Sequence, residues 1–238
     1  MPSSNELVSI VVPVHDKEKA KKCVEHIKRQ TYQNIELIPV DFKGFPAEKR
    51  NYGYRKSKGS FILFLDEDEY MTPTTISACI RKFKEGFEIV GIPQIKVEPK
   101  SYFERCASIL KENVAKPLFF KREVLEKIGI FKPEYVLCDD LELLFRAFSA
   151  GYKLGIIDVK DGHILHDETN SLTPMLRKTL LTRKSYKKLQ ASYGTDLDVL
   201  TRKYSQRKRI FDIVVKQPLL IPGTLCIMLV LFIVRRIP

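Results

Sequence analysis

Apolar runs of five to seven residues alternate with segments of helical periodicity in the first half of the chain. Four runs rich in β-branched and aromatic residues predict buried strands, at 8–14, 35–40, 61–65 and 88–92. Three segments with apolar residues at helical spacing predict helices, at 20–27, 47–58 and 72–83. Such alternation is typical of an α/β fold with a mixed, mostly parallel central sheet and helices on both sides.

The second half of the chain predicts shorter elements and a different C-terminal end. Three helices are expected, at 101–116, 122–128 and 141–150. Three short strands are expected, at 118–120, 154–157 and 163–166. The chain is therefore expected to have three parts: an α/β domain over 1–172, basic amphipathic helices over 173–216 and an apolar segment over 217–238.

Positive charge is concentrated at the C-terminal end. The chain carries 41 Lys and Arg against 29 Asp and Glu, and its last 64 residues alone hold 14 against 3. The excess begins near Pro174, and a second basic helix is expected over 197–215. This asymmetry indicates an anionic partner surface, for which nucleic acid and anionic lipid are the two candidates.

Two groups of acidic residues are the candidate catalytic or metal-binding residues. Asp66-Glu67-Asp68 directly follows the strand at 61–65, and in parallel sheets ligands bind beyond the carboxyl ends of the strands. Mg²⁺ sites commonly combine one or two carboxylates with substrate phosphates, so this run is either a metal and diphosphate site or a solvated acidic turn. Asp139-Asp140 precedes a predicted helix, where it is either an N-terminal cap or a general base. His166, alone after a short strand, is either structural or a ligand.

The segments around these residues resemble the motifs of glycosyltransferase family two, the inverting enzymes with the GT-A fold. Five segments carry the resemblance in the family's order, at 8–16, 30–38, 49–53, 61–68 and 128–146. They include the Arg50-Asn51 helix, the Asp-x-Asp strand and the acidic pair before Leu141. The loop at 41–46 departs from the family, because it lacks the usual Asp-Asp-Gly-Ser run. The resemblance covers roughly residues 7–170.

The resemblance implies the metal-dependent transfer of a sugar from a nucleotide-diphosphate donor to a hydroxyl or lipid phosphate. Asp68 and His166 would hold Mg²⁺ or Mn²⁺, and Asp140 would be the general base. Asp139 and Arg146 would lie on the acceptor side. The implied donor-binding residues are Pro13, His15, Asp41, Arg50, Asp66 and Glu67.

The C-terminal end predicts membrane attachment. Basic residues interleave with Leu and Tyr over 175–189, a pattern typical of helices at a membrane surface. The 17 uncharged residues at 218–234 stand at the lower limit for a helix that spans a bilayer, so a short span and an interfacial segment are both open. Five cysteines without a Cys-x-x-Cys pair indicate a reducing compartment. We therefore expect attachment at the cytoplasmic face of an anionic membrane, with a lipid-linked or membrane-proximal acceptor.

Three alternative functions fit parts of the sequence. A nucleotidyltransferase would carry a Gly-rich phosphate loop after the first strand, where this chain has Pro13-Val14-His15-Asp16. A basic nucleic-acid-binding protein would explain the charge, but the tail has no recognised nucleic-acid module and ends in an apolar run, so no nucleic acid partner is expected. A catalytically dead glycosyltransferase-like protein is the third alternative, although the acidic residues are intact.

Overall fold

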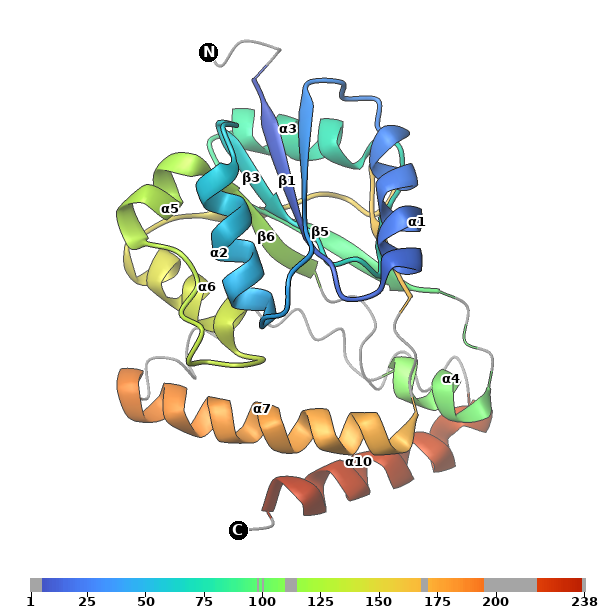
Figure 1. Ribbon diagram of the computed structural model, residues 1–238. Helices are drawn as coiled ribbons and strands as arrows, with labels where there is room; N and C mark the ends of the chain where they lie inside the picture. The colour runs from blue at the N-terminus through green and yellow to red at the C-terminus, as the bar shows by residue number, and fades with distance from the viewer. Residues whose placement is uncertain are drawn as a thin grey trace.

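A mixed eight-stranded sheet forms the centre of the molecule, which the computed structural model describes over residues 6–97, 99, 101–109, 115–167, 171–194 and 218–236 (Figure 1). One half of the sheet is parallel: β1 (Val8–Pro13) lies between β2 (Ile35–Val40) and β3 (Phe61–Phe64) and pairs with both in the same direction. The carboxyl ends of these strands therefore meet at one edge, where the predicted acidic run begins.

The other half of the sheet is joined to the first through an antiparallel strand. β6 (Ala115–Lys121) pairs antiparallel with β3 on one side and with β5 (Ile89–Lys96) on the other. β5 also pairs in parallel with β7 (Leu154–Ile156) and β8 (Ile164–His166). The short strand β4 (Glu69–Met71) pairs antiparallel with β8. Because β4 directly follows the acidic run after β3, this last pairing places β8 beside that run.

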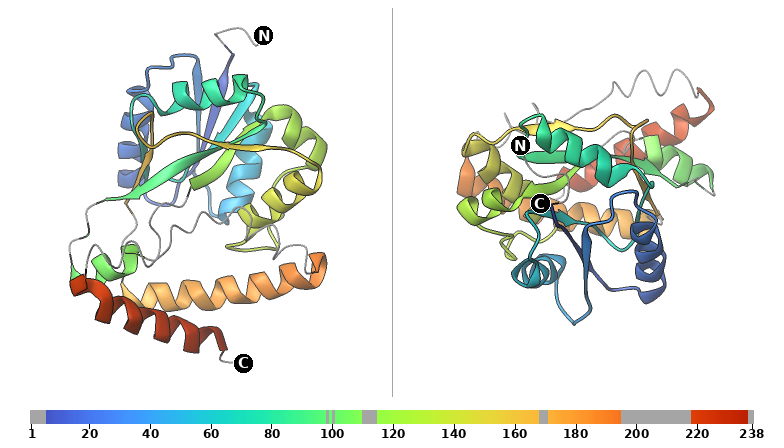
Figure 2. Two further views of the ribbon diagram at one scale, coloured as in Figure 1. Left: turned by 180° about the vertical axis from the view of Figure 1, so that it is seen from behind. Right: turned by 90° about the horizontal axis from the view of Figure 1, so that it is seen from above.

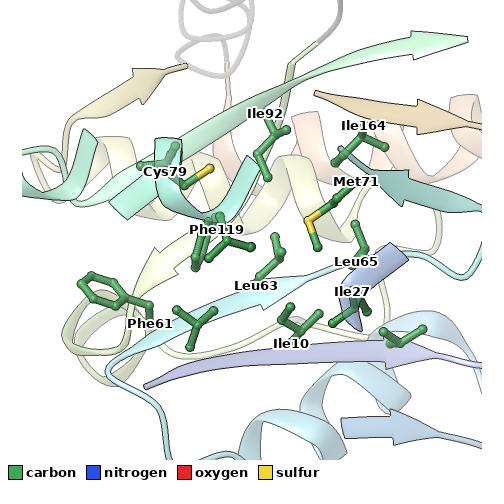
Figure 3. Close-up of a cluster of buried hydrophobic side chains, with 14 of the residues drawn as sticks. Ile10, Ile27, Phe61, Leu63, Leu65, Met71, Cys79, Ile92, Phe119 and Ile164 are labelled. Atoms are coloured by element: carbon green, nitrogen blue, oxygen red, sulfur yellow. The ribbon is translucent and has the colours of Figure 1, made fainter. Parts of the chain in front are cut away.

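Each face of the sheet packs against its own hydrophobic core. α1 (Lys17–Lys28) and α3 (Thr75–Lys84) cover the face on which Ile10, Leu63 and Ile92 are fully buried (Figure 3). On the opposite face, Val11 and Phe64 pack against α2 (Pro46–Lys56), α5 (Arg122–Ile128) and α6 (Asp139–Ser149). Because successive strand residues point to opposite faces, two covered faces require continuous apolar runs, as the sequence of these strands has.

Two helices from the C-terminal part lie beyond the carboxyl end of the parallel strands. α7 (Leu172–Tyr193) crosses beneath the sheet, and α10 (Ile221–Arg236) lies on the far side of α7 (Figure 2). After a short 3-10 turn at Pro218–Leu220, α10 packs against α7 and α4 (Tyr102–Ile109) through a small core that includes Cys106 and Ile227. Its other side exposes apolar residues, namely Leu225, Leu229, Phe232 and Ile233.

The structure confirms the α/β sheet with helices on both faces and corrects several predicted elements. The helix expected over 101–116 is wrong in its last part, because β6 begins at Ala115 and is held between β3 and β5. β4 was not predicted, since three residues directly after an acidic run give no periodic signal. The basic helix expected over 197–215 lies outside the described residues. Among the described helices, none is both long enough and apolar enough to cross a bilayer.

Candidate active site

A cleft at the carboxyl edge of the parallel strands brings most of the predicted site residues together. It encloses a cavity of about 320 Å³. The predicted residues that line it are Pro13, His15, Arg50, Asp66, Glu67, Asp68, Asp139, Asp140 and His166. These residues come from β1, α2, the turn after β3, α6 and β8, so the site depends on the whole sheet.

Backbone pairing holds the acidic run at the end of β3. The N–H of Leu65 donates to the carbonyl of Val11 (3.0 Å), which continues the pairing of β1 with β3. Further along, the N–H of Asp167 donates to the carbonyl of Asp68 (2.8 Å), beside the β4–β8 pair. That contact brings Nε2 of His166 to 3.6 Å from Oδ2 of Asp68. The missed strand β4 is therefore what places the predicted histidine beside the predicted aspartate.

Arg50 links the acidic run to the start of α6. Its largely buried guanidinium donates to Oδ1 of Asp66 (2.7 Å) and to Oδ2 of Asp139 (2.9 Å). Burial alone would raise the pKa of Asp66, but the charges of Arg50 and Lys116 outweigh it and hold that pKa far below its usual range. Burial also raises the pKa of Asp139, against the opposing charge of Arg50. Arg50 thus keeps Asp66 ionised and ties α6 to α2.

A buried lysine that the sequence analysis did not identify lies behind the acidic run. Lys116, on β6, donates to Oδ2 of Asp66 (2.8 Å) and to the carboxylate of Glu69. Burial opposes its charge, but the two carboxylates raise the pKa of Lys116 above its usual value. Because the sequence placed Lys116 at the end of a helix, nothing pointed to a role beside Asp66. Both carboxylate oxygens of Asp66 therefore contact cations.

Glu67 connects the turn after β3 to the loop after β1. Its carboxylate accepts hydrogen bonds from the backbone N–H of His15 and, at 2.9 Å, from that of Asp16. Asp16 in turn caps α1 by accepting from the N–H of Glu18 (3.0 Å). Glu67 thus fixes the backbone beside Pro13, the segment that the resemblance assigns to the donor nucleoside.

The two carboxylates at the start of α6 have different surroundings. Asp139 is buried against Arg50, whereas Asp140 is exposed. Oδ1 of Asp140 accepts a hydrogen bond from the N–H of Leu141 (2.8 Å), which orients the side chain at the first turn of the helix. Of the pair, Asp140 is the one that a substrate in the cavity can reach.

Two of the predicted residues do not line the cavity. Asp41 is exposed after β2 and forms an ion pair with Lys17 (3.5 Å). Arg146 points toward the loop that follows α5, where it donates to the carbonyl of Ile130 (2.7 Å) and forms an ion pair with Glu142 (2.8 Å). Its contacts are those of a positioning residue that holds this loop against α6.

The rest of the cavity lining consists of Phe45, Pro46 and Ala47 at the start of α2, an apolar loop and a cation. Pro133, Val136 and Leu137, which we call the apolar lip, line it together with Lys178 of α7. Leu137 has a φ of 62°, in the left-handed region that branched side chains rarely adopt. Such a conformation costs on the order of 1–3 kcal/mol and persists only where the surroundings enforce it. No local sequence pattern identified the lip or Lys178.

Asp68 and His166 are the candidate protein ligands for a metal ion. Within the described parts of the chain, no three His, Cys, Asp or Glu side chains are grouped closely enough to hold a metal ion. Asp66 already contacts two cations, whereas Asp68 and His166 stand 3.6 Å apart and line the cavity. Mg²⁺ and Mn²⁺ accept carboxylate ligands and commonly keep water or substrate phosphate as the others. These residues therefore fit an ion that is held jointly with a diphosphate.

The sheet order, the Asp-x-Asp turn after β3 and the second acidic pair across the cleft define the GT-A class of α/β proteins. Solved structures share this fold. The mannosyltransferase PcManGT from Pyrobaculum calidifontis, in complex with GDP-Man and Mn²⁺, superimposes with a TM-score of 0.60 at 15% identity, covering 96% of this chain and 76% of that chain. TarS 1-349 of S. aureus, in complex with UDP-GlcNAc, gives 0.52 at 15% identity over 75% and 66% of the two chains.

Sequence comparison finds similarity to known glycosyltransferases over parts of the chain. The model described as Glycosyl transferase family 2 matches residues 43–133. Glycosyltransferase GlyG of Streptococcus pneumoniae serotype 4 is 31% identical over 109 residues, 34% of this chain and 36% of that protein. Glycosyltransferase AglE of Haloferax volcanii is 25% identical over 198 residues, 65% of each. Residues 43–133, less than half of the chain, are thus similar to glycosyltransferase family 2, and the chain spans between about a third and two thirds of the length of these relatives.

Proposed function

We propose that this chain is an inverting glycosyltransferase that moves a sugar from a nucleoside-diphosphate donor to an acceptor hydroxyl. One observation carries the proposal: the Asp68–His166 pair and the exposed Asp140 line the same cavity in a family 2 domain. The first pair suits a metal-bound diphosphate, and the second group suits removal of a proton from the acceptor.

On the proposed donor side, two cations balance the charge of Asp66, the carboxylate that would lie nearest the donor. Arg50 and Lys116 neutralise Asp66, whose fixed oxygens can accept hydrogen bonds from the donor's hydroxyl groups. Asp68 and His166 would hold Mg²⁺ or Mn²⁺, which neutralises the charge of the departing nucleoside diphosphate when bound. The relatives with solved structures hold GDP-Man and UDP-GlcNAc, so both kinds of nucleotide are candidates here.

The acceptor side supplies the base. The acceptor oxygen attacks the anomeric carbon as Asp140 takes its proton, and the bond from that carbon to the phosphate oxygen breaks with its electron pair leaving on the nucleoside diphosphate. One displacement inverts the carbon and needs no covalent sugar–enzyme intermediate. Asp139, which is paired with Arg50, positions Asp140 at the first turn of α6.

The acceptor in this proposal is membrane-proximal, and the chain attaches to the cytoplasmic face of an anionic membrane. Two features support attachment: the exposed apolar side of α10, with Leu225, Leu229 and Phe232, and the excess of basic residues after position 174. Apolar insertion and a basic surface together give stable attachment where either alone is marginal. The five free cysteines fit a reducing compartment.

A donor screen tests the proposed function. The purified full chain, with Mn²⁺ or Mg²⁺ and a membrane lipid extract as the acceptor source, is incubated with a panel of UDP- and GDP-linked sugars. We expect release of the nucleoside diphosphate from one donor, dependent on the metal ion, and a product of inverted anomeric configuration by NMR. Asp140→Asn is the matched control for background hydrolysis. Equal release by the parent and Asp140→Asn would support the catalytically dead alternative, and salt-sensitive DNA binding without any release would support the nucleic-acid alternative.

A further inference from the structure

The turn after β3 concentrates negative charge beside the cavity. Residues 66–69 are four consecutive carboxylates, and the first three of them line the cavity. Like charges at such short spacing disfavour one another unless counter-charges or hydrogen bonds compensate them. A bound metal ion often supplies that compensation. The contacts of each carboxylate therefore show how far the turn is assembled without an ion.

Asp66 and Glu69 converge on one buried ammonium group. Nζ of Lys116 donates to Oδ2 of Asp66 (2.8 Å) and to the carboxylate of Glu69. Lys116 and Glu69 are both buried, and neither lines the cavity. Burial raises the pKa of Glu69, and the charge of Lys116 opposes that rise. Lys116 therefore supplies, from within the protein, the counter-charge that lets these two carboxylates approach each other.

Glu69 closes the turn around Asp66. Its carboxylate accepts a hydrogen bond from the backbone N–H of Asp66 (2.8 Å), and its own N–H donates to the carbonyl of Asp66 (3.1 Å). The side-chain amide of Gln94, on β5, donates to the other carboxylate oxygen of Glu69 (2.6 Å). Through Glu69 and Lys116, the backbone and the side chain of Asp66 are thus connected to β5 and β6, two strands of the central sheet.

Asp68 has different surroundings from Asp66. It faces Nε2 of His166 at 3.6 Å and lines the cavity as the candidate metal ligand. A carboxylate can accept about four hydrogen bonds, so Asp66 can still accept one from a ligand after it has bound Arg50 and Lys116. A metal cation at Asp66 would instead meet two positive charges. Asp66 is therefore suited to a neutral hydroxyl group and Asp68 to a metal ion.

We propose that Lys116, acting with Glu69, is a positioning residue that holds Asp66 in place for the hydroxyl groups of the donor's nucleoside in the absence of a metal ion. The nucleoside half of the donor then binds with or without the metal, whereas the diphosphate half depends on the ion at Asp68. This inference rests on the proposed function, because it divides the recognition of the same donor between two carboxylates.

Nucleotide binding with and without the metal ion tests this division. UDP, GDP and inorganic pyrophosphate are titrated calorimetrically into the full chain, in EDTA and in Mn²⁺. We expect one of the two nucleotides to bind measurably in EDTA and more tightly in Mn²⁺, whereas pyrophosphate should require Mn²⁺. Lys116→Met should weaken that nucleotide by about tenfold or more under both conditions and leave pyrophosphate unchanged, because it removes a charged hydrogen bond to Asp66. Lys121→Met, the same substitution on the same strand where the lysine pairs with Glu123, is the matched control.

The reciprocal variant is Asp68→Ala. It should bind the nucleotide in EDTA like the parent and lose the gain from Mn²⁺, because Asp68 serves the ion and not the nucleoside. In Lys116→Met, by contrast, the factor gained from Mn²⁺ should equal that of the parent. A smaller gain in Lys116→Met, or a loss of EDTA binding in Asp68→Ala, would overturn the division.

A double variant distinguishes positioning from a purely structural role. Lys116→Met leaves Glu69 as a buried carboxylate without its counter-charge, which destabilises the fold. Adding Glu69→Gln removes that charge, so the melting temperature should recover most of the loss. Nucleotide affinity should not recover, since Asp66 still lacks the ammonium group. If affinity and melting temperature recover together, the inference is overturned. If Lys116→Met fails to fold, the double variant carries the measurement.

The outcomes also separate this inference from the proposed function. If a nucleotide binds and its sugar donor is turned over in Mn²⁺, but EDTA abolishes binding, the positioning role is overturned and the glycosyltransferase proposal stands. Equal effects of Lys116→Met and Lys121→Met would also overturn it, since a general loss of positive charge would then explain the binding. If neither nucleotide binds under either condition, the proposed function itself fails.

Discussion

Arg50 and Asp139 form a buried ion pair of 2.9 Å across the active-site cleft, although 89 positions separate them in the sequence. Arg50 belongs to α2, on the proposed donor side, and Asp139 begins α6, which carries the proposed base. The same guanidinium also holds Asp66. One side chain therefore links the turn that carries the proposed metal ligand to the start of the helix that carries Asp140.

Replacing Arg50 with Met should destabilise the fold by about 3 kcal/mol, because it leaves a buried carboxylate at Asp139 without its counter-charge. Asp66 keeps Lys116 at 2.8 Å, so most of the loss arises at Asp139. Urea denaturation at pH 7 measures the effect. The double variant Arg50→Met with Asp139→Asn should regain part of the loss, because the stranded charge is gone. Strict additivity of the two single variants would contradict the pairing.

Most of the residues that line the cavity could be identified from the sequence, because they occupy short local motifs. A local pattern marks each of them: an apolar run precedes Asp66 and Asp68, and Arg50 lies in a predicted helix with a defined start. Lys116 could not be found in this way, since its role appears only when β6 inserts beside β3. Lys178 reaches the cavity because α7 crosses the sheet's carboxyl edge, which no local pattern encodes. The position of these two lysines in the site therefore depends on how distant elements pack, which the local sequence does not show.

Two residues that the resemblance implied for the site lie outside the cavity lining, and their roles stay predictions. Arg146 follows the acidic pair at the expected distance, yet its guanidinium binds the carbonyls before Phe131 and the carboxylate of Glu142. Asp41 stands at the carboxyl end of β2, but it is outside the cavity lining and forms an ion pair with Lys17. A position at the end of a strand therefore does not by itself place a residue in the cavity lining.

Asp68→Ala should abolish the effect of Mn²⁺ on nucleoside diphosphate binding while leaving the fold intact. Asp68 is half-buried at a turn and faces His166, so its removal takes away a metal ligand rather than a core contact. Calorimetric titration with and without Mn²⁺ measures the change. Asp41→Ala, which removes an exposed carboxylate outside the cavity lining, should bind like the parent. A metal response retained by Asp68→Ala would show that the assignment of Asp68 is wrong.

Asp140→Asn should lower turnover by about 10²–10⁴-fold with little change in donor affinity, since the amide cannot accept the acceptor's proton. Asp139→Asn should act differently, because Asp139 is paired with Arg50 and its loss weakens the fold and the donor side together. Steady-state kinetics and donor titrations on both variants distinguish the two roles. Small and equal effects on turnover would rule out Asp140 as the base.

Glu142 should make the stability of the fold depend on pH. Burial alone would raise its pKa, but hydrogen bonds from Arg146, Tyr193 and Lys132 outweigh burial and lower the pKa below the usual value. A lowered pKa in the folded state means that the stabilisation is fully present above about pH 4.3, the ordinary glutamate value, and is lost as the pH falls through the folded pKa.

Glu142→Gln should therefore lower the free energy of unfolding by about 2 kcal/mol at pH 7, where charged hydrogen bonds are lost. The difference between the parent and the variant should shrink as the pH falls toward 3. Tyr193, at the end of α7, donates to Glu142 at 2.5 Å, so hydrogen exchange in α7 should also increase in the variant. A difference that stays constant between pH 7 and pH 3 would show that the carboxylate charge contributes nothing.

The exposed side of α10 should determine whether membrane binding survives high salt. Leu229 and Phe232 are each more than half exposed, whereas Ile227 on the opposite side is buried against α4 and α7. Replacing both exposed residues, Leu229→Gln with Phe232→Gln, removes hydrocarbon from the surface without opening the core. Deleting the whole C-terminal segment would instead uncover Cys106 and Ala107, so substitution is the sharper test.

The measurement is co-sedimentation of the full chain with phosphatidylserine-containing vesicles at low salt and at 1 M salt. The parent should stay bound at high salt, because apolar insertion is not screened whereas surface charge is, at a Debye length of about 3 Å. The double variant should bind at low salt through its basic residues. At high salt, its binding to the vesicles should be weaker than at low salt by about tenfold or more. Phe42→Gln with Val159→Gln, which removes a comparable exposed pair elsewhere, is the control. If the parent dissociates at high salt as readily as the Leu229–Phe232 variant, α10 does not enter the bilayer and the proposal of membrane attachment fails.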